Sequence, residues 1–311
     1  MADIACVGVV VADVVAKPVD DLPQRGSLRL IDAIELHIGG CAANSAVGIA
    51  RLGLDVSLFG HVGADAFGDA VSNRLNREGV DTAGLSRDAS LPTSCTVVLG
   101  HSDGERTFLH VVGANAGLTP ETLDTDRLAQ SRIVHLAGVF LLPGIDPGAS
   151  IMRTLKTKGV ITCADTAWDA QGRWLSLIRP LLPHLDYFLP SWEEAKMISG
   201  RSKPDDAARF LLDQGIGTVA IKQAEQGCWL ADNEKIERLP AYKVEYRDAL
   251  GAGDAFCAGF LSGLAKGLSA RESTQLGNAV GALCVTRLGA TAGLIGWDET
   301  IEFMKRSETN P

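Results

Sequence analysis

Short apolar runs alternate with helical patterns along most of this 311-residue chain. Apolar runs bounded by Gly, Pro or Asp are typical of buried strands, and six occur, at residues 4–11, 55–62, 132–140, 160–165, 186–190 and 217–223. Helical spacing lies between them, at residues 42–53, 67–79, 148–159, 193–200 and 204–215. Repeated strand–helix–strand order favours parallel pairing with right-handed crossovers. The sequence therefore predicts an α/β fold, a doubly wound, mostly parallel central sheet with helices on both faces and ligands at the carboxyl ends of its strands.

Two segments break this alternation. Residues 27–38 alternate apolar and polar side chains, and residues 94–113 hold two strand-like runs around Asp103-Gly104, a strong hairpin signal. Because no helix separates these runs, we expect a small, mostly antiparallel sheet that covers the ligand edge. This lid is drawn from about residues 14–38 and 94–112 of a single domain over residues 1–311. The alternative is an ordinary extension of the main sheet at its edge.

Charge and cysteine usage limit the class of protein. A formal net charge of −9 argues against a nucleic-acid partner or an anionic membrane held by a basic surface. The apolar N-terminus lacks a basic lead and favours a first buried strand over a signal peptide, and no run reaches the length of a membrane span. Seven scattered cysteines without a C-x-x-C pair indicate reduced thiols, so a cytoplasmic location is expected.

The stretch "DALGAGDAFCAGFL" (248–261) opens the first of two nearly consecutive helices predicted between residues 252 and 288. A helix N-terminus attracts anions, and Gly251, Ala252 and Gly253 leave its amides open to close approach. Asp254, in the first turn, is then either a capping acid or a base that accepts a proton beside an anion site. The chain has neither G-x-x-x-x-G-K-[ST] nor the dinucleotide fingerprint, which disfavours P-loop and Rossmann nucleotide sites.

A second motif, "HIGGCAANSAVGIARLG" (37–53), places a glycine pair and Asn44 at the entry of another helix. Together with "DALGAGD" about two hundred residues later, it resembles the ribokinase-like carbohydrate kinase family, also called the PfkB family. Both signature regions stand in the family's order, and the resemblance covers essentially the whole chain. It implies a ribokinase-like fold with a small β-sheet lid, and an ATP-dependent sugar kinase.

The resemblance also implies roles for single residues on the acceptor side. Asp254 matches the family's general base, and Gly251, Ala252 and Gly253 match its anion hole, although Ala249 replaces the usual Thr. The cluster that binds sugar hydroxyls is matched by four residues, and a fifth lies where the lid enters the cleft: Asp13, Gly39, Gly40, Asn44 and Asn115. Arg106 and Arg173 are candidates for contact with an acidic sugar.

On the nucleotide side the resemblance assigns Lys222 and Gly227 to the phosphates and Asn278 to the neighbourhood of the adenine. Glu194 falls at the acidic position of the family's N-x-x-E motif, which implies a water-mediated magnesium site. Ser191 replaces the Asn of that motif. Asp248 resembles part of the potassium loop of some members.

These assignments predict magnesium-dependent transfer of the γ-phosphoryl group of ATP to a primary hydroxyl of a small sugar. An adenosine-type nucleoside kinase is the alternative within the same fold, and a non-catalytic sugar sensor is the alternative outside catalysis. The intact "GAGD" argues against the sensor. The predicted partners are the sugar, ATP and a second copy of the chain, which we expect to form a homodimer through the lid.

Overall fold

The structure, a computed structural model, describes residues 2–103, 105–144 and 148–310. Within these residues the strands of the main sheet are β1 (Ile4–Gly8), β4 (Val56–Gly63), β5 (Asp81–Asp88), β8 (Ile133–Val139), β9 (Ile161–Thr166), β10 (Tyr187–Phe188), β11 (Thr218–Lys222), β12 (Cys228–Ala231) and β13 (Ile236–Leu239). Their order is β13-β12-β11-β10-β9-β8-β1-β4-β5. Pairing is parallel from β5 to β11 and antiparallel from β11 to β13. The predicted doubly wound sheet is confirmed.

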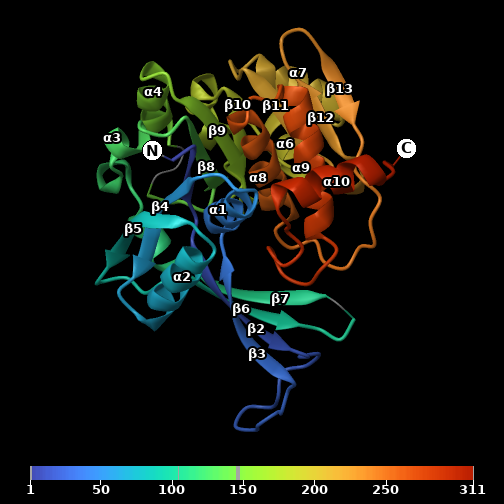
Figure 1. The fold of residues 1–311 in the computed structure, drawn as a ribbon. Coiled ribbons are helices and arrows are strands. Elements are labelled where there is room, and N and C mark those ends of the chain that lie inside the picture. Colours follow the sequence, from blue (N-terminus) through green and yellow to red (C-terminus); the bar gives the residue numbers. More distant parts are fainter. Residues whose placement is uncertain (1, 104, 145–147, 311) are drawn as a thin grey trace.

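Helices cover both faces of this sheet (Figure 1). The helices α1 (Cys41–Arg51), α2 (Ala66–Arg77), α8 (Ala252–Ala265) and α9 (Ala270–Cys284) contribute to one buried apolar cluster. The helices α4 (Ala149–Thr157), α5 (Trp174–Ile178), α6 (Trp192–Ser199) and α7 (Pro204–Leu212) contribute to the other. Alternate residues of β1 divide between them, since Ile4 and Cys6 pack on the α8 side and Ala5 and Val7 on the opposite side. The short α3 (Thr125–Leu128) and the late α10 (Trp297–Arg306) complete the α-helices of the described residues, which also contain four short 3-10 helices.

The lid is a separate four-stranded sheet, made of β2 (Val11–Lys17), β3 (Ala33–Gly39), β6 (Cys95–Gly100) and β7 (Arg106–Val111) in the order β3-β2-β6-β7. It projects from the main body (Figure 1), so the alternative of an edge extension is excluded. The outer pairs are antiparallel, whereas β2 and β6 run parallel. Gly104 of the predicted hairpin turn lies outside the described residues.

One predicted strand, residues 4–11, is divided between the two sheets. β1 ends at Gly8 and β2 begins at Val11, so the chain leaves the main sheet within three residues. Gly8 has a φ of 147°, and a Cβ there would overlap the backbone of Ala137 on β8. A glycine is therefore required where the chain leaves the main sheet for the lid.

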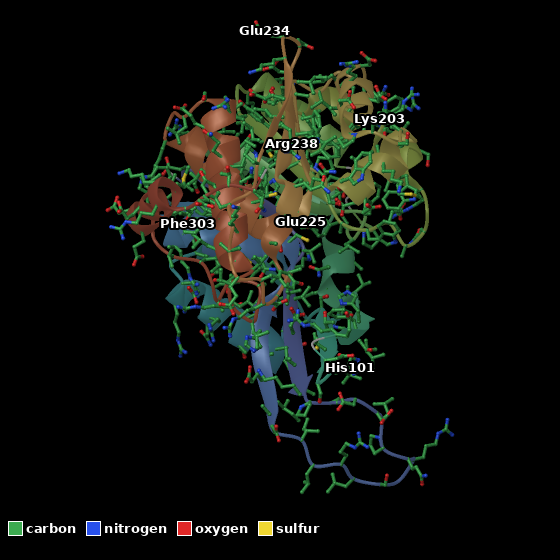
Figure 2. The ribbon with its side chains drawn as sticks, turned by 90° about the vertical axis from the view of Figure 1, so that its right-hand side faces the viewer. His101, Lys203, Glu225, Glu234, Arg238 and Phe303 are labelled. Atoms are coloured by element: carbon green, nitrogen blue, oxygen red, sulfur yellow. The ribbon has the colours of Figure 1, made fainter. Side chains whose placement is uncertain are left out.

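In Figure 2 Glu234, at the turn after β12, lies at the top of the molecule, and His101, on the lid, lies well below it, with the extension of the lid reaching further down. The lid strand predicted over residues 27–38 starts only at Ala33. The residues before it form an exposed extension in which Leu28 and Leu30 are 86% and 87% accessible. Among the described helices, none is both long and apolar enough to cross a bilayer.

Candidate functional site

A cavity of about 800 Å³ lies at the carboxyl ends of β9 and β11, beside the N-terminus of α8. One part of its lining is charged, with Asp165, Glu194, Lys222 and Asp254. Another part is apolar and aromatic, formed by Ala241, Tyr242, Val244, Tyr246, Ala282 and Val285. This is the edge at which doubly wound sheets bind ligands. The division into a charged part and an apolar part suits a ligand that carries phosphates and a flat base.

The start of α8 has the geometry of an anion site. Gly251 precedes the helix in the left-handed region, at φ 75° and ψ 0°, and a Cβ there would lie 2.6 Å from Ala290. Ala252 and Gly253 follow in the first turn and line the cavity. The amide of Ala252 donates to the carbonyl of Ala249 within the turn. The open N-terminal turn and its dipole favour negative charge at this end of the cavity.

Asp254 faces the cavity from the first turn of α8, and its Oδ2 accepts a hydrogen bond from Nδ2 of Asn44 over 2.8 Å. Asn44 belongs to α1, so this bond joins the two helices whose entries carry the sequence motifs. Burial raises the pKa of Asp254 to about 7, and the nearby Asp165 carboxylate adds to this rise, while Asn44 and Lys222 oppose it. The carboxyl group therefore exchanges its proton near neutral pH.

Lys222, the last residue of β11, brings a positive charge to the same place. Its Nζ lies 3.9 Å from Oδ2 of Asp165 and 3.8 Å from Sγ of Cys257. A Cβ on Gly253 would lie 3.4 Å from Nζ, so the ammonium group lies against the start of α8. Burial alone would lower the pKa of Lys222, but the surrounding acidic groups, Cys257 and Asp165 first among them, raise it above its ordinary value. Lys222 is therefore protonated and positively charged at neutral pH.

Glu194 lines the cavity from the first turn of α6. Its Oε2 accepts hydrogen bonds from the amide of Ser191, over 2.8 Å, and from the hydroxyl of Thr166, over 2.9 Å. The hydroxyl oxygen of Ser191 in turn accepts a hydrogen bond from the amide of Glu194, which completes a capping box. Ser191 thus fixes the entry of α6 in place of the family's Asn. An oriented carboxylate in the charged part of the cavity fits a hydrated magnesium ion.

The predicted nucleotide residues Gly227 and Asn278 also line the cavity. Gly227 has a φ of 93°, and a Cβ there would overlap the carbonyl of Leu239. Asn278 lies on α9, and its Nδ2 donates to the carbonyls of Leu239 and Pro240, each over 3.0 Å. Both residues therefore hold the segment after β13 against the apolar part of the cavity.

The predicted sugar-binding residues divide into two groups. Asp13 on β2 lies directly against Gly39 on β3, where a Cβ would overlap its carboxylate. Gly40 has a φ of 94° and caps α1, so Asp13, the glycine pair and Asn44 surround the entry of this helix. Asn115 is only 1% exposed, and both ends of its amide bond to the backbone of Val10. Its polar atoms fix the junction of β1 and β2.

Asp248 is buried outside the cavity lining, and its partners are N–H groups. Its Oδ1 accepts from the amide of Leu250, and its Oδ2 accepts from the amide of Gly289 over 2.7 Å. Arg106 of lid strand β7 also contacts Oδ2, at 2.6 Å. The positive charge at Asp248 is thus a guanidinium group from the lid, an arrangement that does not fit a potassium ligand. Arg173, the other candidate for an acidic sugar, contacts Asp169.

Sequence reasoning missed Asp165 and Cys41, which also line the cavity. Asp165 comes near the end of the buried strand β9, and a carboxylate at this edge of a parallel sheet was the signal that would have found it. Cys41 is the first residue of α1, directly after the glycine pair. Its thiol contributes a hydrogen bond that lowers the pKa of Asp254.

Comparison with known proteins agrees with this architecture. Residues 1–295 match the pfkB family carbohydrate kinase profile. Relatives include a fructokinase of Escherichia coli, 32% identical over 82% of this chain and 88% of that protein. The 2-dehydro-3-deoxygluconokinase of Bacillus subtilis is 27% identical over 92% of each chain. The solved ribokinase of Thermotoga maritima superposes with a TM-score of 0.86 at 26% identity, covering 98% of this chain and 100% of that one. The chain belongs to the pfkB family of carbohydrate kinases.

Proposed function

We propose that this sugar kinase transfers the γ-phosphoryl group of ATP to a primary hydroxyl of a small sugar, with Asp254 as the general base. The observation that carries this proposal is the position of Asp254. It lies in the first turn of α8, faces the cavity, is oriented by Asn44, and has Lys222 nearby. A carboxyl group with a pKa of about 7 is matched to proton transfer at neutral pH.

In this mechanism the ionised Asp254 accepts the proton of the sugar hydroxyl as its oxygen attacks phosphorus. The amides of Gly251 and Gly253 and the Lys222 ammonium stabilise the charge of the transferring group at the start of α8, whereas the amide of Ala252 is already bonded to the carbonyl of Ala249. Such a transfer depends on positioning and on charge neutralisation rather than on covalent catalysis. The lid excludes water, which would otherwise compete as an acceptor.

Three groups of residues complete the site. Asp13, Gly39, Gly40 and Asn44 surround the place proposed for the sugar, and Gly227 and Asn278 shape the nucleotide side. Glu194 would hold magnesium through water, and the ion would neutralise charge on the phosphate oxygens. The proposal includes neither potassium nor Asn115. The carboxylate of Asp248 is already paired with Arg106, and the side-chain amide of Asn115 is hydrogen-bonded to the backbone of Val10.

The names of the relatives favour a sugar over a nucleoside. The fructokinase and the 2-dehydro-3-deoxygluconokinase match this chain over most of its length at 32% and 27% identity. A nucleoside kinase of Methanocaldococcus jannaschii, with a TM-score of 0.82, is 22% identical and shares the fold. We therefore place a sugar or a sugar acid first among the acceptors.

An ADP-release screen tests the proposal. Pentoses, hexoses, keto-deoxy sugar acids, sugar phosphates and nucleosides are offered with ATP and magnesium, and the Asp254→Asn protein serves as the blank. ADP formation that depends on a free sugar or sugar acid, and that Asp254→Asn abolishes, is the expected result. ADP release with nucleosides alone would mean that the acceptor is a nucleoside and not a sugar. No release with any acceptor would favour a non-catalytic sensor.

We also propose that two copies pair through the lid. Several apolar side chains of the lid are more than half exposed to water in the single chain. They are Leu28, Leu30 and Ile34 on the β2–β3 side, and Phe108 and Leu109 on β7. Exposed apolar surface of this extent is typical of an interface. Light scattering at micromolar concentration should give twice the chain mass of 32.8 kDa. A monomer mass would contradict the proposed dimer.

A further inference from the structure

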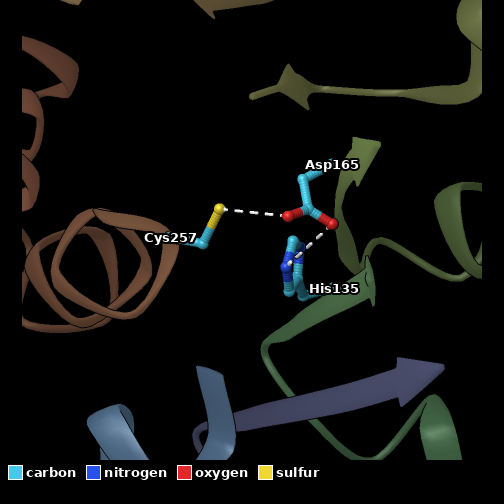
Figure 3. A group of neighbouring side chains, drawn as sticks. All are labelled: His135, Asp165 and Cys257. Carbon is cyan, nitrogen blue, oxygen red and sulfur yellow. Dashed lines mark hydrogen bonds and ion pairs between the residues drawn. The ribbon is translucent and has the colours of Figure 1, made fainter. Parts of the chain in front are cut away.

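A deeply buried group of polar side chains lies at the charged part of the cavity. His135 on β8, Asp165 on β9 and Cys257 on α8 are 0%, 2% and 0% exposed. Figure 3 shows the Asp165 carboxylate between the other two side chains. Its Oδ1 lies 3.8 Å from Nε2 of His135, and its Oδ2 lies 3.6 Å from Sγ of Cys257. Burying a carboxylate this completely is costly unless it has partners.

The partner that offsets this charge is Lys222. Its Nζ lies 3.9 Å from Asp165 and 3.8 Å from Cys257, two of the three groups that a metal ion would otherwise use. The cluster therefore already contains a cation, and a divalent ion there would be repelled by the ammonium group. The arrangement is that of a buried ion pair which reaches the surface of the cavity, since Asp165 and Lys222 both line it.

We propose that Asp165 is a positioning residue for phosphoryl transfer, whose carboxylate holds the Lys222 ammonium beside Gly253 and adds a like charge near Asp254. This inference rests on the proposed function, in which Asp254 is the general base. It gives Asp165 two separable effects, one on the cation that faces the phosphates and one on the proton affinity of the base.

Asp165 is rigidly held for this role. The amide of Gly138 donates to its Oδ1 over 2.8 Å, which fixes the carboxylate between β8 and β9. Lys222 extends from β11, and β10 lies between β9 and β11 in the sheet. The ion pair thus spans the carboxyl ends of three neighbouring strands. Without Asp165, the long Lys222 side chain would lose the partner that restricts it to one position.

The second effect follows from the charges around Asp254. Titratable groups interact with Asp254 or with its neighbour Lys222 from several packed elements. They are Cys6 on β1, Cys41 on α1, His135 on β8, Cys163 and Asp165 on β9, Glu194 on α6, Cys228 on β12, Cys257 on α8 and Cys284 on α9. After burial, the Asp165 carboxylate is the largest cause that raises the pKa of Asp254. Removing its charge should therefore lower that pKa.

The test is Asp165→Asn, which preserves the shape and an acceptor for Gly138 but removes the charge. We expect kcat to fall at least about tenfold, and the acidic limb of the kcat/KM profile to move about one pH unit lower. A merely structural role would not move the limb downwards. Asp165→Glu retains the charge, so its limb should stay nearer that of the wild type than the limb of Asp165→Asn does.

The matched control is Asp169→Asn. Asp169 is also 2% exposed and lies four residues further along the chain, but its carboxylate accepts from the amides of Arg173 and Trp174. This control should lower the melting temperature and leave the acidic limb at its wild-type position. Circular dichroism establishes that each variant is folded, and Asp165→Ser is a second, smaller neutral variant with the same expected shift.

The outcomes separate this inference from the proposed function. An acidic limb that stays in place in folded Asp165→Asn, while Asp254→Asn is inactive, overturns the role of Asp165 alone. Near-normal turnover of Asp254→Asn overturns the proposed base, whatever Asp165 does. If neither Asp165→Asn nor Asp165→Ser folds, Asp165 serves stability, and the inference is rejected.

Discussion

Nδ2 of Asn44 donates to Oδ2 of Asp254 over 2.8 Å, although 210 residues separate them along the chain. This bond is the physical link between the two sequence motifs. The glycine pair ends the lid strand β3 and opens α1, and the "GAGD" segment opens α8. Because α1 packs against α8, with Gly48 allowing close approach to Ala258, the motifs meet at one place. The position of the proposed base therefore depends on both.

Replacing Asp254 by Asn should lower kcat at least about a hundredfold, because the hydroxyl loses its proton acceptor. Nucleotide affinity should change little, since the phosphate contacts assigned to Lys222 and to the start of α8 remain. A coupled ADP assay measures the first quantity and calorimetry with ATP measures the second. Turnover within a few-fold of the wild type would refute the role of Asp254 as the base.

The activity of the wild-type protein should rise with pH through a midpoint near 7. The pKa of Asp254 is raised to about 7, so below this pH the carboxyl group is protonated and cannot accept a proton. Above it the ionised form predominates and kcat/KM reaches a plateau. The kcat/KM profile of the free enzyme between pH 5 and 9 reports this step. A flat profile would mean that no base titrates in this range.

Because the pKa of Asp254 is raised, its ionised side chain should lower the free energy of unfolding at alkaline pH. The folded state holds the proton more tightly than the unfolded state, whose carboxyl has the ordinary value of 3.8, so stability falls as pH rises between these values. At pH 8 the free energy of unfolding of Asp254→Asn should therefore exceed that of the wild type by about 1–4 kcal/mol, and the variant should unfold at a higher temperature. The margin should disappear near pH 3.5. Thermal unfolding at both pH values checks this, and a destabilised variant at pH 8 would contradict it.

Loss of the Asn44 side chain should shift the acidic limb of the kcat/KM profile in the direction opposite to that caused by loss of the Asp165 charge. Its hydrogen bond stabilises the ionised form of Asp254, so Asn44→Ala should move the acidic limb to higher pH and lower kcat about tenfold or more. Ser45→Ala is the control, because the Ser45 hydroxyl bonds the backbone carbonyl of Asp254 and not its carboxylate. Equal limbs in the two variants would show that Asn44 does not set the proton affinity of Asp254.

The ion pair between Arg106 and Asp248 joins the lid to the loop before α8. Arg106→Ala should raise the KM for the sugar about fivefold or more and should increase ATP hydrolysis without sugar, because the lid closes less completely over the acceptor. Arg29→Ala is the control, since Arg29 bonds the exposed carbonyl of Asp21 within the lid extension. The KM values and the sugar-independent ADP release are measured for both variants. Identical values would show that the pair does not hold the lid.

The fold was largely predictable because each element depends on local pattern. Buried strands such as β8 and β9 and helices such as α1 and α8 agree with the predicted segments to within a few residues. The motifs at the entries of α1 and α8 predicted Asn44 and Asp254 as site residues, and the hydrogen bond between them is a finding of the structure. The hairpin β12–β13 and the late helix α10 were not predicted, because their patterns are short or largely polar.

The contacts between distant side chains were not predictable. Asp165 and Lys222 meet only because β9 and β11 flank β10, and the partner of Asp248 is an arginine on the lid. Asn115 was expected at the substrate but binds the backbone of Val10, since a buried polar side chain must satisfy its hydrogen bonds with whatever lies nearest. Such pairings depend on tertiary packing, which a single sequence does not reveal.

The direct passage from β1 into β2 limits how the lid can travel. β1 lies between β4 and β8 in the interior of the main sheet, third from the β5 edge, and only Val9 and Val10 separate it from the lid strand β2. Because Asn115 bonds the backbone of Val10, this connection is short and held, and we expect the lid to open on this side by rotation about the φ and ψ angles of the two valines. Entry of the sugar is therefore expected to require a small rotation of the lid as a rigid unit. It should not require the residues between β1 and β2 to unfold.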